Sequence, residues 1–239
     1  MIMISKKMNT YESWASEISV LTGQSITRQA IECRMNPETS VMIKILLKEK
    51  LTEGINKTKF KGNKEILSKF ERIMLEDSTT LNLPDELAKE FSGNVVRGKK
   101  KSQAKIHALY NFTENIFSFL DTHSFTNNDQ SLSSKVLAYV NKGDLLLRDM
   151  GFLVLDVVKK LLKKGVFIIS RKNAQTKVYD VQNGLEINLA KELRKNHFYD
   201  KIVLVGKTKK IKMRLVILPF SPEQANERRR KAKLDRDKR

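Results

Sequence analysis

The chain has 239 residues, enough to bury a substantial core in one large domain or two small ones. Its formal net charge of +19 favours nucleic acid or an anionic membrane surface as a partner, because such an excess attracts polyanions. No apolar run approaches the roughly 18 residues that span a bilayer, so we expect no membrane partner and a cytoplasmic location. Because the chain has one cysteine and three histidines, a metal would be held by oxygen ligands, which Mg²⁺ and Mn²⁺ prefer.

Residues 1–63 are predicted to form a helical region. Apolar residues recur there at helical spacing, Gly23 offers a stop, and Pro37 interrupts the pattern before it resumes. Short helices joined by a glycine-containing turn are typical of a helix-turn-helix, in which Arg28 would contact DNA. A plain small helical bundle is the alternative interpretation.

Residues 64–175 are predicted to form a mixed sheet. In chain order the pattern indicates a strand over 72–83, a basic loop over 97–105, a hairpin of strands over 105–112 and 116–122, a helix from Asp129, and a strand–helix–strand unit over 144–149, 153–164 and 166–170. The last unit requires parallel strands and a right-handed crossover. This order matches a ribonuclease H-like core of five strands with the first strand in the centre, so the predicted fold class is α/β (α+β).

Two further regions follow this core. Residues 176–220 are predicted to form a β-rich insertion with strands over 177–181, 186–189, 201–205 and 212–218. Residues 221–239 are predicted to form a basic helical tail, which begins with Ser221 as a cap and Pro222 at the first helical position.

Two aspartates stand where apolar strands are predicted to end. Asp77 closes the segment that begins at Arg72, and Asp149 closes the segment that begins at Asp144. An acid on the buried face of a strand is costly unless it is paired or binds a metal. In a chain this basic, the two acids indicate metal-assisted chemistry on a phosphate backbone, with both aspartates as metal ligands and catalytic residues. The alternatives are an Asx turn at Asp77 and a helix cap at Asp149.

Basic residues near these elements are candidates for contacts with the phosphate backbone. They lie in the helical region, in the basic loop and after the last core strand: Arg28, Lys99, Lys100, Lys101, Lys105, Arg171 and Lys172. A solvated loop and ion pairs with neighbouring acids are the alternative roles.

Several segments together resemble the DDE transposases of the bacterial insertion sequence 4 family. They are Thr10-Tyr-Glu-Ser-Trp and Ser25-x-x-Arg-Gln-Ala in the helical region, Glu76-Asp-Ser-Thr followed by Leu83-Pro and Phe91-x-Gly, then Lys105-Ile-His, Leu145-Leu-Leu-Arg-Asp-Met-Gly-Phe and Phe167-Ile-Ile-Ser-Arg. No single motif is specific, but their order and spacing cover most of the chain.

The resemblance implies that Asp77 and Asp149 are the first two acids of a catalytic triad that works with Mg²⁺ or Mn²⁺. It implies cut-and-paste transposition, in which the transposon ends are cleaved and the freed 3′-hydroxyl attacks target DNA. The implied partners are therefore transposon ends and target DNA. The resemblance also implies a homo-oligomer or association with full-length transposase. The implied location is the bacterial cytoplasm, in association with the nucleoid.

The sequence departs from the family at the third acid, which belongs to a Tyr-x₂-Arg-x₃-Glu-x₆-Lys signature beyond the insertion. No segment fits this signature, because Glu223 and Glu227 lack a tyrosine upstream at that spacing. We therefore expect an N-terminal fragment of an interrupted or frameshifted transposase gene, with crippled catalysis.

Two other functions are compatible with the residues. One is a non-catalytic basic nucleic-acid-binding protein that uses the helical region and the lysine-rich loops. The other is a ribonuclease H-like nuclease complete in itself, for which Asp121 or Asp156 would supply the further acid.

Overall fold

The computed structural model describes residues 10–55, 65, 68–96, 98–173, 175–195 and 198–237. The chain divides into two compact units, one made of residues 1–61 with 115–117 and the other of residues 62–114 and 118–239. The boundary predicted near residue 63 lies outside the described residues.

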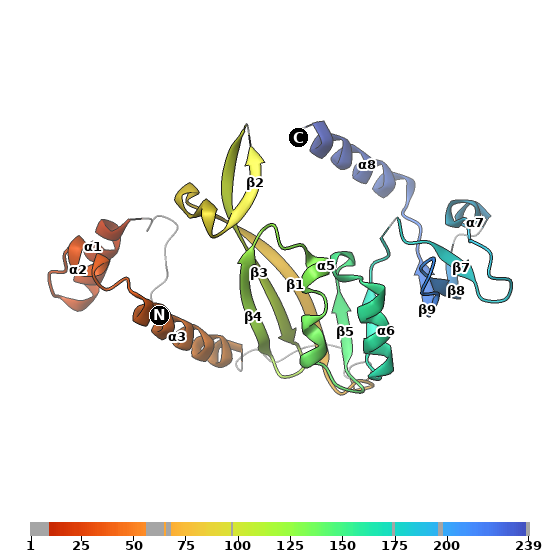
Figure 1. Cartoon of the computed structure of the whole chain (residues 1–239), viewed down its shortest axis with the longest axis horizontal. Coiled ribbons are helices and arrows are strands. Elements are labelled where there is room, and N and C mark those ends of the chain that lie inside the picture. Colours follow the sequence, from red (N-terminus) through yellow and green to blue (C-terminus); the bar gives the residue numbers. More distant parts are fainter. Residues whose placement is uncertain are drawn as a thin grey trace. The chain divides into compact units, whose positions relative to one another are not determined.

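The first unit is helical, as the sequence predicts. It contains α1 (Tyr11–Thr22), α2 (Arg28–Glu32) and α3 (Pro37–Ile55) (Figure 1). Thr10 and Ser13 form a reciprocal capping box at the start of α1, and Gly23 ends that helix with a φ of 67°. Helix α2 packs against α1 and buries Ile31.

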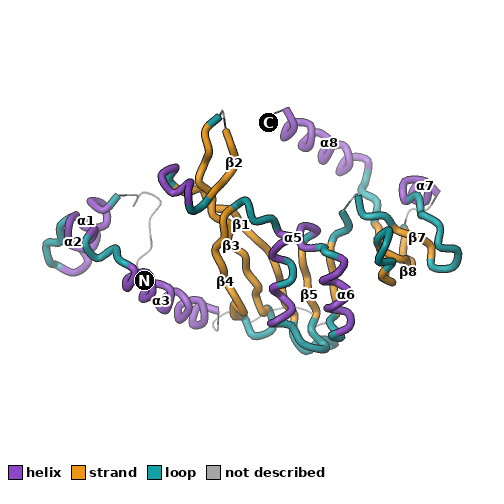
Figure 2. The backbone as a smooth tube through the Cα atoms, viewed as in Figure 1, coloured by secondary structure: helices purple, strands orange, loops and turns teal. Residues whose placement is uncertain are grey.

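The second unit is built on a six-stranded mixed sheet (Figure 2). Its strands are β1 (Ile73–Leu83), β2 (Ser92–Val96), β3 (Lys99–Asn111), β4 (Ile116–Ser124), β5 (Leu145–Arg148) and β6 (Phe167–Ser170). The order is β2-β3-β1-β5-β6, and β4 pairs with β3. Strand β1 runs antiparallel to β3 and parallel to β5, which runs parallel to β6. The predicted mixed sheet with a central first strand is therefore confirmed.

One face of this sheet is packed against a helix, and apolar side chains on the other face are exposed. Helix α6 (Leu155–Lys163) joins β5 to β6 and buries Val157 and Leu161 in a core that includes Met74 and Leu146. Apolar side chains on the opposite face remain open, since Phe167 is 53% exposed and Ile169 is 57% exposed. Because successive strand residues point to opposite faces, β1 and β5 present alternate residues to a packed side and an open side.

Two details of the predicted core are wrong. The basic loop predicted over 97–105 is part of a hairpin, since β3 begins at Lys99, and Lys99 and Lys100 pair with β2. Strand β2 is not predicted from the sequence and follows the short η1 helix (Asp85–Lys89). The sheet therefore has six strands instead of five.

The helix predicted from Asp129 is divided into α5 (Asp129–Leu132) and the short η2 helix (Lys135–Ala138). The carbonyl oxygen of Ser133, between them, accepts a hydrogen bond from buried Arg148. The Ser133 carbonyl oxygen thus bonds to a side chain from another element at the point where the helix is interrupted.

The insertion forms a separate antiparallel sheet of β7 (Val178–Asp180), β8 (Tyr199–Val205) and β9 (Ile211–Ile217). The strand predicted over 186–189 is wrong, because only Glu186 forms an isolated bridge and α7 (Leu189–Lys195) begins at Leu189. The tail is helical over α8 (Pro222–Asp237), as predicted. Among the described residues, no helix is both long enough and apolar enough to cross a membrane.

Candidate active site

Asp77 lies on the open face of β1, in the interior of the strand. The placement of Asp77 at a strand end is wrong, because β1 continues to Leu83, in agreement with the predicted bounds of 72–83. What ends beside Asp77 is the pairing of β1 with β5. Its carboxylate is exposed, and Oδ1 accepts a hydrogen bond from the backbone N–H of Ser78 at 2.8 Å. The buried acid of this segment is instead Glu76, which is 3% exposed and points to the packed face.

Asp149 follows the last residue of β5. Strands β1 and β5 are parallel with Glu76 opposite Arg148, so the next residues along each strand, Asp77 and Asp149, stand at neighbouring positions. Both aspartates line one open pocket, whose other walls are residues of β1, β5 and β6 and the residue after β6: Leu75, Glu76, Leu147, Arg148, Ile169, Ser170 and Arg171. The structure thus brings the two predicted catalytic acids together.

Arg171 is the cation of this pocket. Its Nε and Nη2 atoms donate hydrogen bonds to Asp149 Oδ1 at 2.8 and 2.5 Å. This contact, assisted by the Met150 backbone, lowers the pKa of the Asp149 carboxyl below its ordinary value, so the carboxylate is charged at neutral pH. The Arg171 side chain is 71% exposed, and that of Asp149 is 38% exposed.

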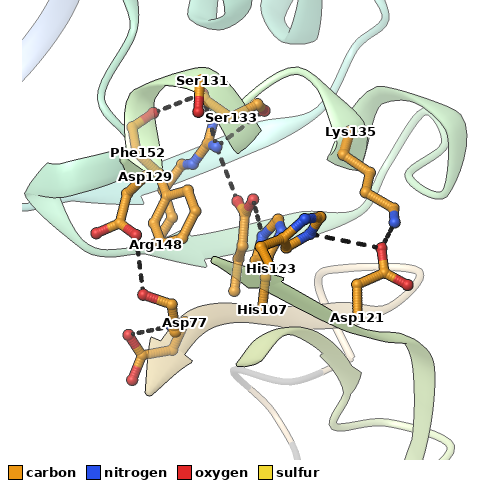
Figure 3. A network of polar contacts seen from close by, with 12 residues as sticks. Asp77, His107, Asp121, His123, Asp129, Ser131, Ser133, Lys135, Arg148 and Phe152 are labelled. Carbon is orange, nitrogen blue, oxygen red and sulfur yellow. Dashed lines mark hydrogen bonds and ion pairs between the residues drawn. The ribbon is translucent and has the colours of Figure 1, made fainter. Parts of the chain in front are cut away.

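A buried polar cluster lies on the packed face of the sheet and contains Glu76 and Arg148, the residues that precede the two aspartates. Figure 3 shows its members Arg148, His107, Ser133 and Phe152 near Asp77. Arg148 Nη2 lies 2.8 Å from Glu76 Oε2, and His107 Nε2 lies 3.1 Å from Glu76 Oε1. Arg148 also donates to the carbonyl and hydroxyl oxygens of Ser133 at 3.1 and 2.9 Å. The Phe152 ring stacks on His107 with centroids 5.0 Å apart and covers the Arg148 guanidinium.

Sequence reasoning missed this cluster, although a signal was available. Glu76 and Arg148 each immediately precede a predicted catalytic acid and each end an apolar run. Burial lowers the pKa of Arg148, and the neighbouring Glu76 carboxylate opposes that effect. A charged residue at a position whose alternation places it in the core indicates an ion pair.

Lys105, which is predicted to contact DNA, is buried and forms an ion pair within the protein. It is 8% exposed, and its Nζ atom lies 2.9 Å from Asp129 Oδ1, which also accepts a hydrogen bond from Ser78 Oγ at 2.9 Å. A buried ammonium group held by a carboxylate is not available to a phosphate, so its position favours a structural role.

The other basic candidates lie at the surface or partly buried. Lys99 and Lys100 are exposed at the start of β3, and Lys101 pairs with Asp85 at 2.7 Å. Lys172 donates to the backbone oxygen of Asn173 at 2.8 Å, and burial lowers the pKa of its amine. In the helical unit, Arg28 is about half exposed and pairs with Glu12 at 2.9 Å.

No third acid joins the pair within the part of the chain that the structure describes. Across those residues, no group of three or more His, Cys, Asp or Glu side chains is arranged to hold a metal ion. Asp156 pairs with Lys209 at 2.8 Å, and Asp121 pairs with Lys135, so both alternative acids are engaged elsewhere.

Comparison with known proteins gives a family match and several relatives. Residues 68–231 match the family described as "Transposase DDE domain". A transposase for insertion sequence element IS1151 from Clostridium perfringens and one for IS231E from Bacillus thuringiensis subsp. finitimus are each 25% identical to this chain over 235 residues, which is 90% of this chain and 49% of the relative. A transposase for IS231F from Bacillus thuringiensis subsp. israelensis is 25% identical over 164 residues, 69% of this chain and 34% of that protein. The chain spans about half the length of the first two of these relatives.

Proposed function

Because the chain belongs to the transposase DDE domain family, we propose that it acts in cut-and-paste DNA transposition as part of a metal-dependent transposase of the insertion sequence 4 type. The observation that carries this proposal is the shared pocket of Asp77 and Asp149 on the open face of the mixed sheet. Two carboxylates that converge from neighbouring strands in a chain of net charge +19 suit chemistry on a phosphate backbone.

The residues of the pocket fit a divalent metal ion. The family implies dependence on such a metal, and we propose Mg²⁺ or Mn²⁺, since both prefer carboxylate oxygens. The exposed carboxylate of Asp77 and the ionised carboxylate of Asp149 would hold it. When bound, the ion would activate the attacking oxygen and neutralise the leaving oxygen of a phosphodiester.

The basic residues of the chain would position DNA against this pocket. Arg171 is mostly exposed and pairs with Asp149, and its guanidinium would be free to bind a phosphate oxygen if Asp149 bound a metal instead. Lys99 and Lys100, on the hairpin of β2 and β3, would contact the backbone on either side of the scissile bond. Arg28 would contribute from the helical unit and Lys172 from the segment after β6.

We further propose that catalysis by the two acids alone is weak. Activation of the nucleophile and of the leaving group commonly takes two ions held by three carboxylates. Of the three acids that line the pocket among the described residues, Glu76 is buried against Arg148, so only Asp77 and Asp149 are accessible to an ion. Reading the DNA downstream of codon 239 in three frames for Tyr-x₂-Arg-x₃-Glu-x₆-Lys tests this directly. Finding the signature would supply the third acid, and its absence would favour a function without catalysis.

The absence of a third acid from the described pocket also favours a second candidate function. In this alternative, the chain is a non-catalytic basic DNA-binding protein that occupies transposon ends or joins full-length transposase subunits. Both candidates predict DNA binding that weakens steeply with salt. Only a metal-dependent reaction that requires the aspartates separates them.

Nicking of DNA is the experiment that tests the first proposal. The substrate is a supercoiled plasmid that carries the DNA flanking this gene on both sides, incubated with the protein and Mg²⁺ or Mn²⁺. We expect slow nicking by the wild-type chain and none by Asp77→Asn or Asp149→Asn. Asp200→Asn, which changes an aspartate in the separate small sheet, is the matched control. Equal nicking by all four proteins would contradict the proposal.

A further inference from the structure

Two ion pairs stand at the two ends of the contact between β1 and β5. At the first end, Arg72 Nη2 and Nε donate to the two Asp144 carboxylate oxygens at 2.6 and 3.0 Å. At the other end, Glu76 and Arg148 pair at 2.8 Å with both side chains fully buried. The Asp144 side chain is 1% exposed, so three of the four charged groups lie in the core.

The apolar residues between these two ion pairs do not by themselves specify the register of β1 against β5. Strand β5 offers Leu145-Leu-Leu147, and β1 offers Ile73-Met-Leu75 opposite it. A shift by two residues would place apolar side chains beside apolar side chains on the same face. A register is strongly specified only where a shift would move a side chain into an unfavourable environment. Here only the charged residues at the two ends of the apolar segments meet that condition.

The order of the charges specifies one arrangement of the two strands. In the observed parallel register, acidic Glu76 on β1 stands opposite basic Arg148 on β5. Basic Arg72, the residue before β1, pairs with acidic Asp144, the residue before β5. In the antiparallel arrangement Arg72 would face Arg148, and Glu76 would face Asp144. Every shifted or reversed arrangement therefore buries unpaired or like charges, which is strongly unfavourable.

We propose that the pairs Arg72–Asp144 and Glu76–Arg148, the register pairs, fix the parallel register of β1 and β5 and thereby hold Asp77 and Asp149 at adjacent positions as metal ligands. Glu76 and Arg148 are positioning residues, since each is followed by one of the two acids and points to the opposite, packed face. The link to metal binding rests on the proposed function, whereas the effect on register does not.

The variant that tests this inference removes both buried charges and keeps the size of the side chains. Glu76→Gln/Arg148→Met retains an oxygen for His107 and leaves no unpaired ion, and replacement of a whole buried pair is often tolerated. Asp200→Asn/Arg214→Met is the matched control, because it makes the same kinds of change at an ion pair in the small sheet.

Two measurements are made on the full chain. Cross-strand nuclear Overhauser contacts between the β1 and β5 backbones report register, and the free Mn²⁺ signal in electron paramagnetic resonance reports metal affinity. We expect one set of contacts for the wild type and the control, which pairs Met74 with Leu146. For the Glu76→Gln/Arg148→Met variant we expect a second set or the loss of this set, with Mn²⁺ affinity lowered by about tenfold or more.

A folded Glu76→Gln/Arg148→Met protein with wild-type contacts and wild-type Mn²⁺ affinity would overturn the inference. Altered register with unchanged affinity would overturn its positioning part. If this variant does not fold, Arg72→Met/Asp144→Asn tests the same register at the end where Arg72 is 24% exposed, with the same expected contacts. Wild-type protein that binds no Mn²⁺ would refute the proposed function, while the backbone contacts would still decide the role of the register pairs.

Discussion

The two sheets of this chain use the same kind of cross-strand ion pair in opposite environments. In the six-stranded sheet, Glu76 and Arg148 pair at 2.8 Å with no exposed side-chain surface. In the three-stranded sheet, Arg214 and Asp200 pair at 2.5 Å, but the Arg214 side chain is 67% exposed. An unpaired charge is tolerated in water and is not tolerated in a core. The difference teaches that burial, and not distance, decides which pair controls structure.

The largest expected effect comes from breaking the buried pair on one side only. Arg148→Ala leaves the Glu76 carboxyl group in the core without its guanidinium partner, so we expect a loss of about 3–5 kcal/mol in the free energy of unfolding, measured by urea denaturation. Arg214→Ala, the same change in the exposed pair, is the control and should leave the unfolding midpoint unchanged. A similar midpoint for the two variants would show that burial does not separate these pairs.

The apolar cores of the two sheets offer a second contrast. Leu146 is fully buried in the core of the large sheet, whereas Leu215 only partly joins the core of the small one. Leu146→Ala should lower the free energy of unfolding by about 2–5 kcal/mol, and Leu215→Ala should lower it less. Urea titrations of both variants measure this order, and the reverse order would contradict the account of the packed face.

The basic hairpin of the large sheet should contribute to DNA binding. Lys99→Ala/Lys100→Ala removes two exposed charges, so we expect weaker binding and a salt dependence whose logarithmic slope is smaller by about 1.8. Lys159→Ala/Lys163→Ala, two exposed lysines of α6, is the charge-matched control. Fluorescence anisotropy at several salt concentrations gives both slopes. Identical slopes for the two variants would remove the hairpin from the interface.

The smallest effect is expected at the exposed pair of the small sheet. The Arg214 guanidinium lowers the pKa of Asp200 below its ordinary value of 3.8, so the pair is present above that pH and is lost as pH falls through the lowered value. Arg214→Gln should raise the Asp200 pKa towards 3.8 without changing the melting temperature at pH 7. Carboxyl NMR titration measures this shift, and an unchanged pKa would contradict it.

The sequence predicts the elements of the core well because each one is local in origin. An apolar run marks the start of β1, and Gly143 and Gly165, both with positive φ angles, lie in the turns that precede β5 and β6. The order of strands then follows from the parallel crossover. The parallel strand order also places Asp77 beside Asp149. The exposure of Asp77 on the open face of the sheet is not predicted.

The features that the sequence does not predict depend on contacts between distant segments. Lys99–Lys101 look like a solvated loop until β2 provides a partner strand. The predicted helix after Asp129 divides because Arg148 binds the Ser133 carbonyl from another element. Lys105 becomes buried because Asp129 reaches it across 24 residues. In each case a tertiary contact overrides the local pattern.

The central claim is that Asp77 and Asp149 together hold a divalent metal ion, and Mn²⁺ binding tests it most directly. The wild-type chain, Asp77→Ala and Asp149→Ala are titrated with Mn²⁺, and the free ion is measured by electron paramagnetic resonance. Asp200→Ala serves as the matched control. Binding of Mn²⁺ by the wild type and the control, with its loss in both site variants, is the predicted result. Equal binding by all four proteins, or none by the wild type, would contradict the claim.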